Sequence, residues 1–223
     1  MTTRKKITQT ILGLLICYVT VIYIPQGIKL FFKAEGEVSK FLIYAFCQIG
    51  LCLSLLFYVL KVEKRSLASI GFKPFIGERD VKWGLIGFGL AGISFAITGP
   101  LLESFGFEST RDEVIKLAKY SIWMRIGIAV IAGFPEEILF RTYPLERLSE
   151  LFGNIWIAGL ISLILFAGLH LPFWSLGGAI QIGIGTLIWT LIYIKTRSIW
   201  TMIIMHTVND LFAFVVLPYF FVG

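Results

Sequence analysis

Long apolar runs separated by short polar segments extend along the whole chain. Most of them approach the roughly 20 residues that a helix needs to cross about 30 Å of hydrocarbon, and no alternating strand pattern accompanies them. The pattern therefore predicts an all-α fold, a polytopic membrane helix bundle with about seven transmembrane helices, of which the fourth is the least regular. The seven runs span about residues 7–24, 41–60, 83–102, 126–144, 152–171, 173–194 and 199–221.

The composition agrees with lipid as the main solvent. Of the 223 residues, 57% are hydrophobic and 15% are charged, whereas a soluble domain carries about a quarter charged residues. No repeat or low-complexity segment divides the chain, so we expect one membrane domain over residues 1–223. Within it, residues 1–120 hold three helices and interfacial loops, and residues 121–223 hold a four-helix core. Residues 1–24 have the basic start and apolar centre of a signal peptide, but the absence of an Ala-x-Ala-like site favours a retained first helix.

The charged residues lie mostly between the apolar runs. The net charge is +6, yet no basic helix or aromatic–basic surface is evident, so membrane lipid is a better partner than nucleic acid. With the N-terminus inside, the inner segments hold 13 Lys and Arg residues and the outer segments 7. This bias predicts a multi-pass protein of the cell membrane with a cytoplasmic N-terminus. Cys17, Cys47 and Cys52 lie in apolar runs without metal-like spacing, which indicates packing rather than a disulfide framework.

The stretch GFPEEILFR, residues 133–141, places two adjacent glutamates and an arginine inside the fourth apolar run. A charge at bilayer depth is costly unless it has a partner or a wet cavity. Glu137 and Arg141 are four residues apart and can pair on one helix face, whereas Glu136 is turned by about 100°. The spacing predicts a Glu137–Arg141 ion pair and a Glu136 carboxylate that faces a cavity as a general base. Pro135 removes a backbone donor just before the pair, which favours a kink that admits water.

Both histidines of the chain also lie in apolar runs. His170 ends the fifth run in FAGLH, one turn after Phe166. His206 lies in HTVND of the seventh run, with Asn209 and Asp210 three and four residues later. Either neighbour can hold the tautomer of the His206 imidazole or share in binding an oxyanion.

Taken singly, each feature has an ordinary structural interpretation. A structural ion pair is the more frequent role of residues such as Glu137 and Arg141, a lone histidine in a membrane helix often forms an interhelical hydrogen bond, and Phe166 alone is core packing. Together, the acidic pair and every histidine of the chain lie in three separate apolar runs. Because polar groups are costly there, the combination favours a functional polar site.

The same residues resemble the three motifs of the CPBP (Abi) family of intramembrane proteases, which includes type II CAAX prenyl proteases and bacteriocin-processing or self-immunity proteins. EEILFR fits Glu-Glu-x-x-x-Arg, FAGLH fits Phe-x-x-x-His and HTVND fits His-x-x-x-Asp/Asn, in this order. The resemblance covers about residues 126–221 and makes residues 121–223 the expected catalytic core. It implies an intramembrane endopeptidase, a CAAX-type peptide hydrolase that cleaves a membrane-associated or prenylated protein or peptide with a glutamate-activated water.

The resemblance also implies a role for each motif residue. Glu136 and His170 would activate the water, while His206 and Asp210 would steady the oxyanion. Asp210 stands where prenyl proteases commonly have asparagine, so its main role would be to orient His206. No cofactor is expected, but Glu136, His170 and His206 are competent zinc ligands, which leaves a metal-dependent alternative. The supporting residues are Glu137, Arg141, Phe166 and Asn209.

Two other classes of function stay open. A proton-coupled transporter also places ionisable groups at mid-membrane, although no inverted repeat is evident, and a non-enzymatic bacteriocin-immunity or scaffold protein would keep only the family's shape. For a protease, we expect water to enter through a cytoplasm-facing cavity. Helix rise places His170 about 12 Å further outward than Glu136 and His206 if the fifth helix begins at Phe152.

Overall fold

Every regular element in residues 3–32 and 36–221, which the computed structural model describes, is a helix. The all-α prediction is confirmed. The α-helices are α1 (Thr3–Phe32), α2 (Glu37–Phe57), α3 (Gly77–Ser104), α4 (Thr110–Leu117), α5 (Ile122–Gly133), α6 (Tyr143–Phe152), α7 (Ile155–His170), α8 (Leu176–Thr196), α9 (Ile199–Leu211) and α10 (Pro218–Phe221). A 3₁₀ helix, η2, spans Leu67–Ile70, and π-helical segments span Tyr58–Val62 (η1), Glu137–Thr142 (η3) and Phe212–Val216 (η4).

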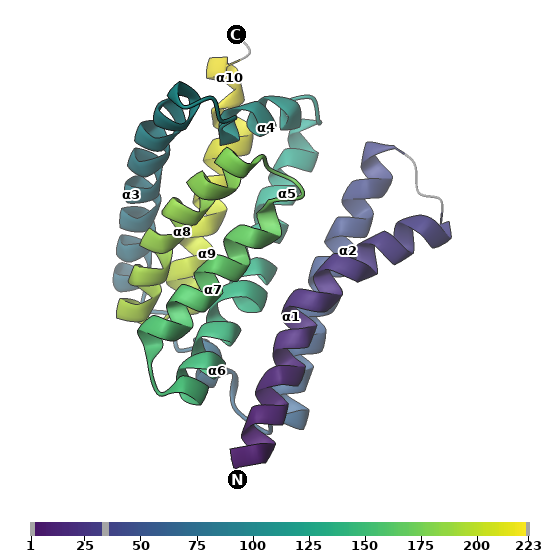
Figure 1. The fold of residues 1–223 in the computed structure, drawn as a ribbon, viewed down its shortest axis with the longest axis vertical. Coiled ribbons are helices and arrows are strands. Elements are labelled where there is room, and N and C mark those ends of the chain that lie inside the picture. The colour runs from purple at the N-terminus through teal and green to yellow at the C-terminus, as the bar shows by residue number, and fades with distance from the viewer. Residues whose placement is uncertain (1–2, 33–35, 222–223) are drawn as a thin grey trace.

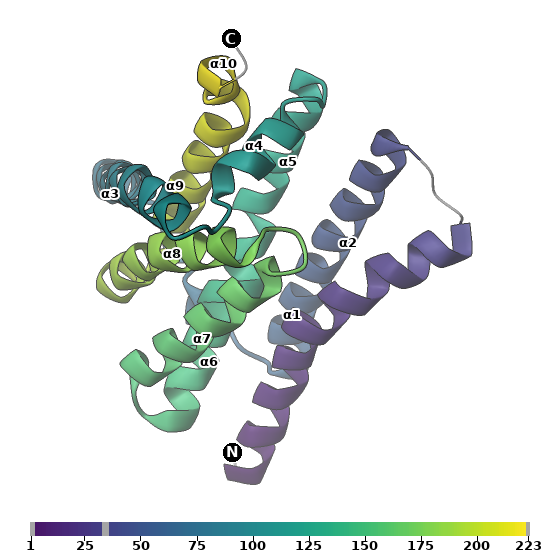
Figure 2. The ribbon, with the colours of Figure 1, turned by 45° about the horizontal axis from the view of Figure 1, so that its top comes forward.

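The helices form a bundle with a flanking pair. Helices α1 and α2 lie side by side along one flank of the other helices (Figure 1), and the view in Figure 2 shows the same arrangement. In the rest of the molecule α3 packs on α8 and α9, α5 packs on α9, and α7 packs on both α6 and α8. The start of α1 and the short α10 lie at opposite ends of the molecule (Figure 1).

Four helical stretches in the described residues are long and apolar enough to cross a membrane, and the shorter α7 is also apolar. Large apolar side chains such as Phe46 and Trp156 are exposed on the outside of the bundle, as expected for a surface that faces lipid. The chain is therefore an integral membrane protein, and the number of about seven crossings stays a prediction. The four stretches are Glu37–Val62, Gly77–Ser104, Leu176–Thr196 and Ile199–Phe220.

The fourth apolar run does not form the single helix that residues 126–144 predicted. Helix α5 ends at Gly133, and a turn at Phe134 precedes Pro135. Because proline has no N–H to donate to the preceding turn, the α-helical ladder cannot continue through it. The chain then winds through the π-helical η3 into α6. The kink expected at Pro135 is thus present, as a break that separates two shorter helices.

The fifth helix begins later than the sequence predicted. Phe152 is the last residue of α6, and Gly153, with a φ of 66°, turns the chain in the left-handed region that glycine adopts readily. The Asn154 side chain then accepts hydrogen bonds from the backbone N–H groups of Trp156 and Ile157, which caps α7. The depth predicted for His170 assumed that the helix begins at Phe152, and this assumption was wrong because α7 begins at Ile155.

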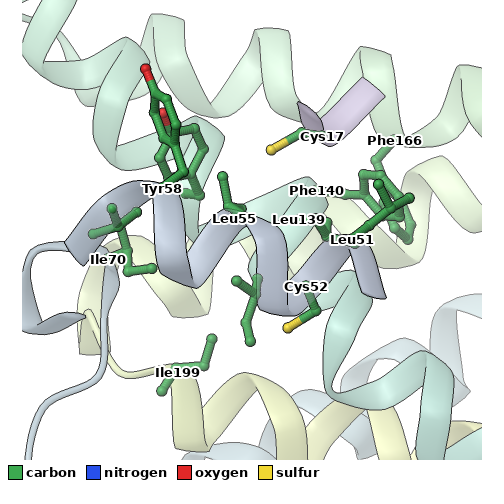
Figure 3. Close-up of a cluster of buried hydrophobic side chains, with 13 residues drawn as sticks. Cys17, Leu51, Cys52, Leu55, Tyr58, Ile70, Leu139, Phe140, Phe166 and Ile199 are labelled. Carbon is green, nitrogen blue, oxygen red and sulfur yellow. The ribbon is translucent and has the colours of Figure 1, made fainter. Parts of the chain in front are cut away.

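A buried apolar cluster joins the flanking pair to the π-helical segment. Figure 3 shows Leu51, Cys52 and Leu55 on α2. Cys17 of α1 lies on one side of α2, and Ile199 of α9 lies on the other. Ile138, Leu139 and Phe140 of η3 belong to the same cluster and are all buried. Burial of this surface fixes α2 against the segment that carries the acidic pair.

Helices α5 and α9 approach closely where α5 ends. A Cβ added at Gly133 would lie 3.0 Å from the Cα of Thr207, so glycine is required for this approach. We expect Gly133→Ala to destabilise the protein by about 1–3 kcal/mol, because one helix must move to make room. Thermal unfolding of the purified protein in detergent measures the effect. The control is Gly89→Ala in α3, where an added Cβ meets nothing within 4 Å. Equal unfolding temperatures for the Gly133 variant and the wild type would contradict the prediction.

Ion pairs link three segments at the end of the molecule where α1 begins. Arg147 of α6 bonds Glu63 at 2.6 Å and also reaches Ser69, and these two residues lie between α2 and α3. Arg65 and Glu150 form a two-bond pair, each bond 2.6 Å long. Arg197, after α8, pairs with Glu146 of α6, and the Tyr193 hydroxyl donates to the same carboxylate. The network ties the α2–α3 connection and the end of α8 to α6.

The pair of Arg65 and Glu150 gives the fold a pH dependence. Partial burial opposes ionisation of Glu150, but the hydrogen bonds from Arg65, together with the positive charges of Arg65, Arg147 and Lys6, outweigh it and lower the pKa of the carboxyl from its ordinary value of 4.5. A carboxyl with a lower pKa in the folded state stabilises the fold above its unfolded pKa and loses this contribution as the pH falls through the folded pKa. We expect Glu150→Gln to lower the unfolding temperature at about pH 7, with a gap to the wild type that closes below about pH 4.5.

Thermal unfolding of the two proteins across this pH range measures the gap. Glu113→Gln serves as the control, because Glu113 pairs with the exposed Lys116 side chain and such pairs contribute little. A gap that stays constant with pH would show that the ionised Glu150 carboxylate does not stabilise the fold.

Candidate active site

A π-helical turn places the acidic pair. Glu136 precedes η3, and Glu137 is its first residue. A wider turn disturbs the regular backbone ladder, and π-helical turns occur frequently at functional sites. The Phe140 carbonyl inside this turn accepts hydrogen bonds from the Ser162 hydroxyl of α7 at 2.7 Å and from the Tyr18 hydroxyl of α1 at 3.3 Å. Side chains of two neighbouring helices therefore hold the turn in place.

A cavity of about 950 Å³ lies next to this turn. Its wall is mostly apolar, and the site residues that line it are Glu136, Phe166, His170, His206, Asn209 and Asp210. His170 and Glu136 thus face one space despite the depths that helix rise suggested. The lining also reaches Glu103, near the end of α3, and Arg111, near the start of α4, and α4 lies at the end of the bundle opposite the start of α1 (Figure 1). With a cytoplasmic N-terminus this is the outer end, so the predictions of a cytoplasmic N-terminus and of a cytoplasm-facing cavity do not agree with each other, and both stay predictions.

Glu136 is held by two polar side chains of α2. The Tyr44 hydroxyl donates to Glu136 Oε1 at 3.1 Å, and Gln48 Nε2 donates to the same oxygen at 3.2 Å. The sequence prediction omitted both residues. The available signal was a tyrosine and a glutamine four residues apart in an apolar run, since this spacing puts them on one face of a membrane helix.

Glu137 lies at the centre of a buried charge cluster. It is fully buried and forms the expected ion pair with Arg141. The Arg141 guanidinium lies 5.1 Å from the Phe166 ring centre and 5.4 Å from that of Trp189, a cation–π arrangement on two rings. Glu137 also contacts His206 Nδ1 at 2.7 Å, a contact that the sequence did not predict.

His206 has carboxylates near both ring nitrogens. Nδ1 contacts Glu137, and Nε2 lies 3.4 Å from Asp210 Oδ2. Carboxylates at both nitrogens suit a ring that donates from both. The longer contact leaves the Nε2–H the freer of the two donors. Asn209 Nδ2 donates to Asp210 Oδ1 at 3.1 Å, so Asn209 steadies the carboxylate beside the histidine.

His170 has a defined tautomer when neutral. Its Nδ1 lies 2.8 Å from the backbone carbonyl oxygen of Phe166, which can only accept a hydrogen bond. Nδ1 therefore carries the proton, and Nε2 has a free lone pair. The Phe166 ring packs against the imidazole at 4.5 Å between ring centres, which fixes the ring orientation. A neutral His170 is thus arranged to accept a proton from a group in the cavity.

The structure unites some of the predicted residues more closely than others. Glu137, Arg141, His206 and Asp210 form one continuous cluster, whereas no hydrogen bond joins Glu136 to His170 within the described residues. In the same part of the chain, no three His, Cys, Asp or Glu side chains group so as to hold a metal ion. Glu136, His170 and His206, the set considered for zinc, do not form such a group in this arrangement.

Residues 118–212 match the family model described as Rce1-like, type II CAAX prenyl endopeptidase. Over this segment, which is less than half of the chain, the protein is similar to the type II CAAX prenyl endopeptidases. The matched segment contains all three motifs, from Glu136 to Asp210, and it supports a peptide hydrolase. No curated protein and no solved structure matches the chain.

The endopeptidase match begins after α4 and therefore excludes Tyr44 and Gln48. The two side chains that donate hydrogen bonds to Glu136 thus come from outside the matched segment. The match gives no support to a transporter or to a non-enzymatic immunity or scaffold protein.

Proposed function

We propose that the protein is an intramembrane endopeptidase that hydrolyses a peptide bond with a water activated by Glu136. The observation that carries the proposal is one mostly apolar cavity lined by the Glu136 carboxylate, a proton-accepting nitrogen at His170 and the His206 cluster. A base, a second proton acceptor and a donor for developing negative charge are the groups that peptide hydrolysis requires. The endopeptidase family match supports the same reaction class.

The proposed steps use these groups in order. Glu136 takes one proton from a water molecule, with His170 Nε2 as a second acceptor in the cavity, and the resulting hydroxide adds to the peptide carbonyl carbon. The carbonyl oxygen becomes an oxyanion, to which the Nε2–H of His206 donates. The C–N bond then breaks as the protonated Glu136 returns its proton to the leaving amine. Glu137 and Arg141 hold His206 in place and touch no reacting atom.

The mostly apolar cavity suits a substrate that carries apolar groups at the membrane. A prenylated CAAX-type peptide and an unmodified membrane-associated peptide both meet this description. We propose the cell membrane as the location, with the N-terminus in the cytoplasm, on the charge bias of the polar segments.

The test is hydrolysis by purified protein in lipid nanodiscs. A farnesylated CAAX peptide, its unprenylated twin and a bacteriocin leader peptide are each incubated with wild type and with Glu136→Gln, and mass spectrometry locates any cleaved bond. Cleavage of at least one peptide by the wild type alone supports the proposal. A chelator in parallel samples tests zinc dependence directly. Absence of cleavage for all peptides, or equal cleavage by both proteins, contradicts the proposal.

A further inference from the structure

Within the described residues, Glu136 receives two side-chain hydrogen bonds, and both come from α2. The Tyr44 hydroxyl and the Gln48 amide donate to the same oxygen, Oε1, at 3.1 and 3.2 Å. Both donors line the cavity, and Gln48 is only 5% exposed. We propose that Tyr44 and Gln48 are positioning residues that fix Oε1 and thereby present Oε2 of Glu136 to the nucleophilic water. This inference rests on the proposed hydrolytic function.

Two donors on one oxygen restrict a side chain that otherwise has three rotatable bonds. A general base must lie within hydrogen-bond reach of the proton that it takes, and small displacements lower the rate steeply. With Oε1 occupied twice, the lone pairs of Oε2 remain for the water. Both donors belong to α2, and the buried apolar cluster that includes Leu51 and Leu55 packs α2 against η3. The flanking pair of helices thus contributes to the geometry of the site.

The orientation of the Gln48 amide follows from its partner. An ionised carboxylate only accepts hydrogen bonds, so the NH₂ group of Gln48 must face Glu136. The amide oxygen then points elsewhere, and it is buried without a hydrogen-bond partner among the described residues. Because this oxygen is buried, a water in the cavity does not reach it, and Gln48 acts on the site through the NH₂ group that it donates to Glu136.

A purely structural role makes a different prediction. Buried polar side chains in membrane helices also connect helices by hydrogen bonds, and Tyr44 and Gln48 would then affect unfolding but not the turnover of folded protein. The comparison variant is Tyr58→Phe. Tyr58 follows α2 directly, and its hydroxyl donates to the Gln9 carbonyl at 2.8 Å, away from the cavity. Tyr58→Phe thus removes a tyrosine hydroxyl, as Tyr44→Phe does, from the same stretch of chain.

The experiment measures kcat, KM and thermal unfolding for Tyr44→Phe, Gln48→Met, Gln48→His and Tyr58→Phe, with the peptide that the wild type cleaves. Loss of a hydrogen bond to a charged group is expected to lower kcat about tenfold to a hundredfold in Tyr44→Phe and Gln48→Met, with KM within about twofold. Gln48→His restores an N–H donor and is expected to recover part of the loss. Tyr58→Phe is expected to keep the wild-type kcat.

The outcomes separate the two proposals. If the wild type cleaves a peptide and Glu136→Gln does not, the hydrolytic function stands. Unchanged kcat in Tyr44→Phe and Gln48→Met then overturns the positioning role alone, as does a fall in unfolding temperature without a change in kcat per folded molecule. If the wild type cleaves none of the peptides, the function fails and the positioning role fails with it.

Discussion

Replacing Glu136 by glutamine is expected to lower kcat about a thousandfold, within the range that general acid–base catalysis contributes. Glutamine has nearly the same shape as glutamate but cannot take a proton from water at neutral pH. Its amide oxygen still accepts the hydrogen bonds that Tyr44 and Gln48 donate to Glu136 Oε1. The fold should therefore persist while the base is lost, and kcat measured on the cleaved peptide reports the difference.

Two measurements make the result specific for the carboxylate of Glu136. The unfolding temperature of Glu136→Gln should stay close to that of the wild type, which shows that the loss is chemical. The matched control is Glu113→Gln, because Glu113 is a carboxylate of α4 that does not line the cavity. Its kcat should be unchanged. Retention of more than about a tenth of the wild-type kcat by Glu136→Gln would remove Glu136 from the role of base.

The sequence predicted most of the site because its residues are chemically conspicuous. Ionisable groups in apolar runs are rare and costly, so Glu137, Arg141 and His206 could be picked out without a structure. The ion pair between Glu137 and Arg141 followed from helical spacing alone, and the structure contains it. The Glu137–His206 contact could not be derived in this way, because it depends on how α9 packs against η3.

Residues of types that are common in membrane helices were not predicted, because little in the sequence distinguishes them from ordinary packing residues. Tyr44 is ordinary in a membrane helix, and only its spacing from Gln48 hints at a shared polar face. Trp189 packs on Arg141 and, with ring centres 5.0 Å apart, on His206, yet a single tryptophan in an apolar run carries no signal. Interhelical partners depend on tertiary packing, whereas periodicity reports only which residues share a face of one helix.

Element boundaries show a similar limit. An apolar run predicted one helix over residues 126–144, since hydropathy does not distinguish an α-helix from a π-helical turn of the same composition. Pro135 signalled the break, but the wide turn of η3 after it had no sequence signal of its own. That turn determines where Glu136 and Glu137 point. The site therefore depends on the local backbone feature that the sequence predicted least well.

Replacing Arg141 by methionine is expected to destabilise the protein by about 3–5 kcal/mol, because one partner of a buried ion pair is left uncompensated. Arg141 is 2% exposed, and its guanidinium lies between the rings of Phe166 and Trp189. Methionine fills a similar length of that space without a charge. Glu137 would keep its contact with His206 but lose that with Arg141, so the charge cluster at the cavity would lose a cation. Unfolding in detergent measures the loss of stability.

A double variant separates the buried pair from other effects of the Arg141 substitution. Removing both charges, with Glu137→Gln added to Arg141→Met, is expected to cost less than the sum of the two single changes, since neither charge is then left alone. The exposed control is Lys195→Met, which removes a cation that lies 4.1 Å from the ring centre of Trp83, where such a contact contributes about 0.5–1 kcal/mol. Additive losses in the double variant would show that the Glu137–Arg141 pair does not act as a unit.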